Sequence, residues 1–252
     1  MPIVPQSYTD IFKLRGEAHA EAFRLYPEAC REEGARILRL ASPKSGETLL
    51  DLPAASGYLS TYMDEPGVRV IAVDPSPLFH AQCLSRGLES YLARLDDLPL
   101  ADGIVDVAVC LAGLHHEPNR LRVFREISRV LRPTGRLAIA EIAKGSSVAA
   151  FFDGFVNDHN SLGHQGMFVD DAFLADLSTA GFRVVQDEVA NYHWNFASRE
   201  AMADFLQLAF GIDRASPDEI ISAVETILGI DPLPYGGVAM RWSLRALLAL
   251  PA

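Results

Sequence analysis

Two stretches decide the fold of this chain: Leu49–Ser60, which reads LLDLPAASGYLS, and Val70–Pro77, which reads VIAVDPSP. Each begins as a short apolar run typical of a buried strand, reaches an acidic residue and passes into signals for a turn and a helix start. Asp74 follows Asp51 by roughly the 20 residues expected in a nucleoside site, where the first turn holds the polar tail of the ligand and the second acid binds the ribose. The two stretches therefore predict a nucleoside site at the carboxyl edge of a parallel sheet.

The composition is that of an ordinary globular chain, with 49% hydrophobic and 22% charged residues among 252. This length suffices for one α/β domain, or for one domain with a cap. The net charge of −11 argues against nucleic acid and anionic membrane as partners, because both are bound through basic faces. Neither partner is therefore expected.

Export and membrane signals are not expected either. The start of the chain, MPIVPQSYTD, has neither the basic residues nor the apolar core of a signal peptide. No apolar run reaches the roughly 18 residues that span a bilayer. The chain has three cysteines, Cys30, Cys83 and Cys110, which are odd in number and widely spaced. This pattern favours reduced thiols over a disulfide framework. The sequence thus predicts a cytoplasmic protein.

Strand and helix patterns alternate along most of the chain. The predicted strands are Thr48–Leu52, Val68–Val73, Ser90–Arg94, Ile104–Ala112, Arg136–Ile142 and Phe182–Val189. The predicted helices lie within Tyr8–Ala41 and at Gly57–Met63, from Pro77 onward, and at Asn119–Leu131, Asp170–Ala180, Ser198–Phe210 and Pro217–Leu228. Val238–Leu248 fits either a helix or a strand. Strands separated by helices imply a parallel, doubly wound sheet.

Five motifs in fixed order carry a family resemblance. They are Leu49–Gly57, Val73–Ser76, Leu98–Val109 (LPLADGIVDVAV), Leu114–His116 with its continuation Phe124–Leu137, and Ala180–Phe182. With these motifs, residues 49–189 resemble the class I S-adenosylmethionine-dependent methyltransferases of the small-molecule type 11, which are similar to ubiquinone/menaquinone methylases. We expect residues 238–248 to resemble the same family again.

The resemblance implies an α/β fold: a Rossmann-like, doubly wound, seven-stranded sheet with a reversed last strand, plus a helical cap. Phe182–Val189 and Val238–Leu248 would then form the terminal hairpin, which favours a strand for the latter. The implied domains are an N-terminal helical cap segment (1–45), a Rossmann-like cofactor domain (46–195 and 236–252, with a lid at 145–168) and a helical insertion of the cap (196–235).

The sequence departs from the family pattern at three positions. Pro53 and Ala55 stand where the first motif of the family has glycines, and only Gly57 remains. Arg94 stands where the family places the acid that accepts a hydrogen bond from adenine, which arginine cannot do. Asp96, Asp97 or a backbone carbonyl can replace that acid.

The resemblance implies S-adenosylmethionine as cofactor and S-adenosylhomocysteine as product. It assigns the ribose to Asp74, for which a turn or helix-cap acid is the other interpretation, and the methionine amino group to Asp51, which can also be a turn-stabilising acid. Leu95 would flank adenine. The cofactor residues implied are Asp51, Pro53, Ala54, Ser56, Gly57, Asp74, Pro75, Ser76, Arg94, Leu95, Asp96, Leu111 and Ala112.

Candidate residues for the chemistry come from loops near the expected site. His116, just past a strand, and His164, in a glycine-flanked turn within the lid, are the candidate proton acceptors, although either can be an ordinary loop histidine. The substrate candidates are His115, Gln165, Tyr192 and Trp194; the two aromatic residues can instead pack against the insertion. No metal site is expected, because adjacent histidines do not easily face one ion.

Three functions compete at this stage. The first is methyl transfer to an oxygen, nitrogen or carbon of a small, aromatic or heterocyclic metabolite by a monomer or homodimer. The second is a protein of the same fold that binds S-adenosylmethionine or S-adenosylhomocysteine without methylating. The third is a nicotinamide dehydrogenase, disfavoured because the glycine fingerprint G-x-G-x-x-G is absent.

Overall fold

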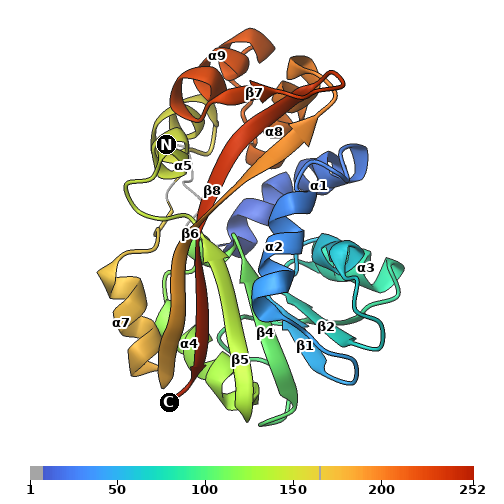
Figure 1. The fold of residues 1–252 in the computed structure, drawn as a ribbon, viewed down its shortest axis with the longest axis vertical. Coiled ribbons are helices and arrows are strands. Elements are labelled where there is room, and N and C mark those ends of the chain that lie inside the picture. The colour runs from blue at the N-terminus through green and yellow to red at the C-terminus, as the bar shows by residue number, and fades with distance from the viewer. Residues whose placement is uncertain (1–7, 165) are drawn as a thin grey trace.

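One sheet organises the structure, and its strands lie in the order β3-β2-β1-β4-β5-β8-β6 (Figure 1). The computed structural model describes residues 8–164 and 166–252. Strands β1 to β5 are parallel, and β8 runs antiparallel between β5 and β6. The strands are β1 (Thr48–Asp51), β2 (Arg69–Asp74), β3 (Glu89–Leu92), β4 (Val105–Leu111), β5 (Leu131–Glu141), β6 (Phe182–Phe196), β7 (Ile230–Pro232) and β8 (Val238–Pro251).

The predicted doubly wound sheet with a reversed last strand is thereby confirmed. The seven strands of the main path are those expected, and the short β7 pairs with β8 as an eighth. Val238–Leu248, which fitted helix or strand, lies within β8. The strand predicted at Phe182–Val189 continues to Phe196, because β8 pairs with it along its whole length.

Helices cover both faces of the sheet, as the alternation of strand side chains requires. Val107 and Val109 of β4 pack in the apolar cluster that includes α2 (Arg31–Ala41). Ala108, between them, belongs to the opposite cluster, which holds α4 (Arg120–Val130) and α7 (Asp171–Thr179). On the α2 face, α3 (Pro77–Ser85) packs on β2 through contact of Cys83 with Ala72.

A helical cap stands above the carboxyl edge of the sheet (Figure 1). Its helices are α1 (Tyr8–Leu25), α5 (Ser147–Ala150), the π-helical turn η3 (Phe151–Val156), α6 (Asn157–His159), α8 (Arg199–Phe210) and α9 (Pro217–Ile227). The outer halves of β6 and β8 extend into it, where Phe196 pairs with Val238. No helix within residues 8–164 and 166–252 combines the length and the apolar character needed to cross a membrane.

Four strands end at the edge that the cap covers. Asp51, Asp74, Leu111 and Glu141 are the last residues of β1, β2, β4 and β5. Short turns of 3-10 helix, η1 (Tyr58–Tyr62) and η2 (Leu114–His116), follow β1 and β4 at this edge. The carboxyl edge of parallel strands is where ligands of such sheets bind, so the fold places the predicted acids at the expected position.

Candidate functional site

Asp74 is fully buried and is held by three hydrogen bonds. The Tyr8 hydroxyl donates to Oδ2 at 2.9 Å, the Ala55 amide donates to the same oxygen at 2.8 Å, and the Ser76 amide donates to Oδ1 at 2.8 Å. Burial raises the pKa of Asp74 to about 7, against the lowering effect of these donors. Helix α3 is capped by the Ser76 side chain, which accepts from Phe79, so Asp74 is not its cap. The carboxylate is thus a buried acceptor at the end of β2.

The turn after β1 is shaped by contact with the exit of β4. A Cβ on Gly113 would lie 2.3 Å from Cγ of Pro53, so the proline ring fills the space that this glycine leaves open. Gly57 has a φ of +74°, and a Cβ there would meet Leu88 at 2.7 Å. Asp51 is buried, and burial together with the charge of Asp74 raises its pKa to about 8.

Asp51 lines a small space that we call the cofactor cavity. Its volume is about 40 Å³. The turn after β1, the end of β4 and one face of α1 line it: Tyr8, Phe12, His19, Asp51, Pro53, Ala54, Ala55, Tyr58, Leu59, Leu111, Ala112 and Gly113. Ligand sites of roughly 300 Å³ or more are usual, so a nucleoside needs α1 to move outward.

A wide groove beside α1 passes Pro75 and Ser76, which directly follow Asp74. Its volume is about 1060 Å³, and it is lined by Thr9, Phe12, Lys13, Leu14, Glu17, Pro75, Ser76, Pro77, Leu78, Leu92, Ala93 and Arg94. The Arg94 guanidinium binds both carboxylate oxygens of Asp96 at 2.8 and 2.9 Å. Leu95, predicted to flank adenine, packs instead in the apolar core, and Leu92 and Ala93 line the groove.

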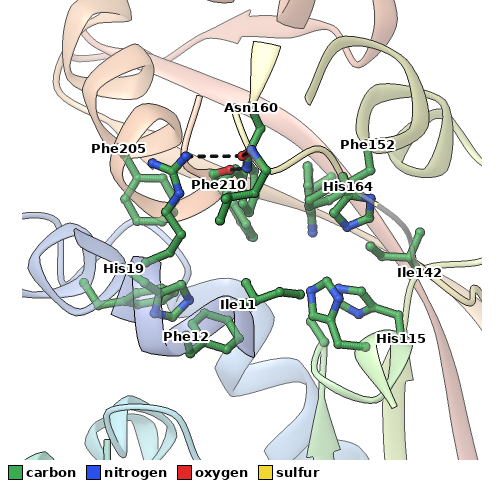
Figure 2. Close-up of a pocket in the computed structure, with 18 of the residues that line it drawn as sticks. Ile11, Phe12, His19, His115, Ile142, Phe152, Asn160, His164, Phe205 and Phe210 are labelled. Carbon is green, nitrogen blue, oxygen red and sulfur yellow. Dashed lines mark hydrogen bonds between the residues drawn. The ribbon is translucent and has the colours of Figure 1, made fainter. Parts of the chain in front are cut away.

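A third space, which we call the acceptor cavity, lies between α1, the rest of the cap and the end of β4, and its volume is about 120 Å³. Figure 2 shows Phe12 and His19 of α1 across it from Asn160 and Phe210. Aromatic side chains form much of its wall: Phe12, Phe23, Tyr58, Phe152, Trp194, Phe205, Phe210 and Trp242. The acceptor and cofactor cavities share Phe12, His19, Tyr58 and Ala112 as lining residues, so these residues form a common wall.

Two sets of hydrogen bonds hold helix α1 over the site. Tyr8 binds Asp74 at the sheet edge. Arg15 reaches the cap, where it donates to Ser161 at 2.7 Å and to Asp213 at 2.6 Å. Phe12, between these two contacts, lines all three spaces. Helix α1 therefore separates the groove from the two cavities.

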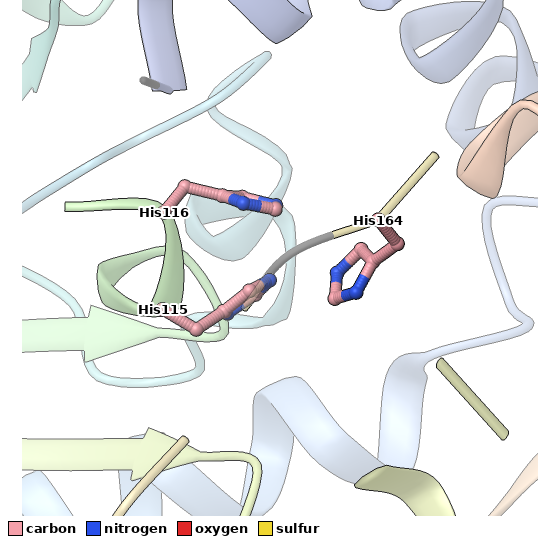
Figure 3. A group of neighbouring side chains, drawn as sticks. All are labelled: His115, His116 and His164. Atoms are coloured by element: carbon pink, nitrogen blue, oxygen red, sulfur yellow. The ribbon is translucent and has the colours of Figure 1, made fainter. Parts of the chain in front are cut away.

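Three histidines meet at one end of the acceptor cavity: His115, His116 and His164 (Figure 3). One ligand atom from each lies within 4.8 Å of the others. Adjacent histidines were expected to diverge, yet a short turn of helix brings both rings to face His164. Burial lowers the pKa of His116 well below its usual value, with nearby histidines adding to the effect, and lowers that of His164 to about 3. Both imidazoles are therefore neutral at pH 7.

The remaining predicted residues fall in different places. Trp194 lines the acceptor cavity, where it stacks on Trp242 with ring centroids 4.3 Å apart. Tyr192 lines a separate surface pocket beside α2. Gln165 lies outside the described residues.

Sequence reasoning did not find Tyr8, Phe12, His19 and Glu33, all of which come from the two N-terminal helices. Glu33 is buried in the acceptor cavity wall, where its carboxylate accepts from Nε1 of Trp194 at 3.0 Å. Burial raises the pKa of Glu33 to about 7. The sequence signal for Glu33 was an acid on the apolar face of an expected helix, four residues before Ile37.

Comparison with known proteins finds methyltransferases among the similar sequences. Residues 50–139 match the family model of a type 11 methyltransferase domain. The ubiquinone/menaquinone biosynthesis C-methyltransferase UbiE of Rubrivivax gelatinosus is 32% identical over 111 residues, which are 43% of this chain and 44% of that protein. The matched segments span 40–44% of the length of this and similar curated relatives.

Solved structures share the fold over nearly the whole chain. The [4+2]-cyclase SpnF superposes with a TM-score of 0.66 at 14% identity and covers 99% of this chain and 98% of its own. The phospholethanolamine N-methyltransferase 2 of Haemonchus contortus, in complex with phosphomonomethylethanolamine and S-adenosylhomocysteine, gives 0.63 at 14% identity over 97% of this chain and 60% of its own. Residues 50–139 thus carry a methyltransferase domain of type 11, and over this segment the chain is similar to S-adenosylmethionine-dependent methyltransferases.

Proposed function

We propose that the chain transfers the methyl group of S-adenosylmethionine to an oxygen, nitrogen or carbon atom of a small aromatic or heterocyclic metabolite. The observation that carries this proposal is the common wall of the two cavities, formed by Phe12, His19, Tyr58 and Ala112. When the sulfonium methyl group lies at this wall, the acids that hold the donor are on one side of it. The aromatic acceptor cavity is on the other side.

The residues present fit the donor. Asp74 accepts from the ribose hydroxyls once Tyr8 has moved away, and Asp51 binds the methionine ammonium group. The turn Ala54–Gly57 surrounds the methionine chain. Adenine enters the groove beside Pro75 and Ser76, between α1 and the end of β3, with Leu92 and Ala93 taking the flanking role first assigned to Leu95.

The transfer itself is an in-line displacement. The bond from sulfur to the methyl carbon breaks as a bond from the acceptor atom to that carbon forms, and S-adenosylhomocysteine is released as a neutral thioether. The chain's main contribution is to hold the acceptor about 3 Å from the methyl group in a space that excludes water. An acceptor that carries a proton must also lose it to a base.

Three buried groups of the acceptor cavity can take that proton. His116 and His164 are neutral with free lone pairs, but their lowered pKa makes them weak bases, suited to a proton that becomes acidic as the methyl group arrives. Glu33, with a pKa of about 7, is the stronger base at neutral pH.

The walls of the acceptor cavity support an aromatic substrate. Rings of Phe152, Phe210 and the stacked pair Trp194 and Trp242 offer faces and edges for a flat acceptor. We further propose a cytoplasmic enzyme, in keeping with Cys30, Cys83 and Cys110 as free thiols, acting as a monomer or homodimer.

The test has a binding arm and a turnover arm. Calorimetric titration with S-adenosylmethionine and S-adenosylhomocysteine should show one site per chain. The isotopically labelled methyl group of S-adenosylmethionine should then pass to members of a panel of phenols, aromatic amines and heterocycles. His116→Phe should slow this transfer, whereas His80→Phe, on the outer helix α3, should not. Binding without turnover on any acceptor favours the non-methylating alternative, and absence of binding to either ligand contradicts the proposal.

A further inference from the structure

The histidine cluster at the end of the acceptor cavity has the geometry of a ligand set. The ring centroids of His115 and His116 are 4.0 Å apart, and those of His164 lie 5.9 and 5.5 Å from them. Figure 3 shows His164 on a separate segment, facing the two consecutive histidines. The three rings therefore surround one point from two sides.

Glu141 fixes the orientation of His115. Its Oε2 lies 2.9 Å from Nδ1 of His115, and its Oε1 accepts from the Leu114 amide at 2.5 Å. A carboxylate accepts hydrogen bonds, so Nδ1 of His115 is the donor to Glu141 and Nε2 is the ring nitrogen that remains for a metal. A buried carboxylate behind an imidazole is the usual outer partner of a metal-bound histidine.

The segment that carries His164 is held on both sides. The His164 amide donates to Oδ1 of Asn157 at 3.1 Å, and the Met167 amide donates to the carbonyl oxygen of His115 at 2.8 Å. The second bond ties the segment directly to the turn that carries the other two histidines. His164 is thus positioned by one hydrogen bond to the Asn157 side chain and by a main-chain bond close to it in the chain.

Several imidazole nitrogens of the cluster have no partner. Nδ1 of His116 and both ring nitrogens of His164 are buried without a hydrogen bond among residues 8–164 and 166–252. Unpaired buried polar atoms are rare because each costs free energy, and several that face one point indicate a group they would bind.

We propose that His115, His116 and His164 bind a divalent cation of the zinc class, with Nε2 as the His115 ligand and Glu141 as its positioning residue. Imidazole ligands suit zinc and its neighbours and do not suit magnesium or calcium, which prefer oxygen. Zinc–nitrogen distances of about 2.0–2.1 Å place tetrahedral ligands roughly 3.3 Å apart, so small rotations of the rings close the set.

The remaining coordination position opens into the acceptor cavity, which all three histidines line. Three protein ligands and one open position are typical of a site where the ion binds a substrate oxygen or water. The role toward a methyl acceptor rests on the proposed function: the ion would bind a hydroxyl oxygen of the acceptor and lower its pKa, and the released proton would pass to Glu33 in the wall of the same cavity. Binding of the ion does not depend on that function.

The test uses protein without an affinity tag, treated with a chelator, and no S-adenosylmethionine. Calorimetry with Zn²⁺ and metal analysis after gel filtration should give one ion per chain, Mg²⁺ should not bind, and Co²⁺ should give the absorption bands of a low-coordinate site. Glu141→Gln should weaken Zn²⁺ binding by about 10–100-fold, as outer partners do, and His164→Phe and His116→Phe should weaken it further.

Two controls separate this cluster from other histidines. His19→Phe replaces another imidazole of the same cavity, and His193→Ala removes the exposed contact with Asp231; both variants should bind Zn²⁺ as the wild type does. Equal binding by wild type and His164→Phe, or no stoichiometric uptake by the wild type, overturns the proposal. Should the ligand variants fail to fold, X-ray absorption on the zinc-loaded wild type decides: three imidazoles support the site and fewer than three overturn it.

Discussion

Removal of the Tyr8 hydroxyl should make the protein bind S-adenosylmethionine more tightly. In the structure this hydroxyl donates to Oδ2 of Asp74 at 2.9 Å, at the place where we propose that the ribose binds. A hydrogen bond to a charged group contributes about 1.5–3 kcal/mol, and Tyr8→Phe removes it from the free protein but not from the complex. The dissociation constant should therefore fall by about 10- to 100-fold.

Calorimetric titration of the variant and the wild type at pH 8 measures this change. Tyr62→Phe is the matched control, because it deletes a buried tyrosine hydroxyl bonded to the Pro27 carbonyl, away from the cofactor cavity. Both variants should lose thermal stability, yet only Tyr8→Phe should gain affinity. Unchanged or weaker binding by Tyr8→Phe would refute the reasoning that Tyr8 and the ribose compete for Asp74.

Three further predictions concern the acids and the turn. Ribose binding needs ionised Asp74, whose pKa in the free protein is about 7. The dissociation constant measured by calorimetry should therefore rise by up to about tenfold per pH unit as pH falls below 7. Asp74→Asn should remove this pH dependence. Gly113→Ala sets a Cβ 2.3 Å from Pro53, which should cost about 1–3 kcal/mol in denaturant unfolding and be rescued by Pro53→Gly, whereas Gly154→Ala, with nothing within 4 Å, should be neutral. The pKa of Asp51 is raised from its ordinary 3.8 to about 8, so the folded state loses stability as pH rises between these two values. Asp51→Asn should therefore raise the melting temperature of the free protein at pH 9 while it weakens S-adenosylmethionine binding.

The sheet and the acids at its edge were predictable because their signals are local. Apolar runs that end in Asp51 and Asp74 mark the ends of β1 and β2, and parallel pairing brings those ends together without further information.

The residues that close the site were not predictable, because their contacts span the chain. Tyr8 meets Asp74 across 66 positions, and Glu33 meets Trp194 across 161. The periodicity of an amphipathic helix shows which face is buried but not what that face meets. Convergence of His164 with His116 likewise depends on how the segment before α7 folds back over η2.

The central claim is that Asp74 binds the ribose hydroxyls. It is tested most directly by a thermodynamic cycle that changes the ligand and the protein in turn. Calorimetry would compare S-adenosylhomocysteine with its analogue lacking one ribose hydroxyl, on the wild type and on Asp74→Asn, so that effects of the variant on the fold cancel. Loss of the hydroxyl should weaken binding by about 10- to 100-fold in the wild type and by little in the variant. Equal losses in both proteins would contradict the claim.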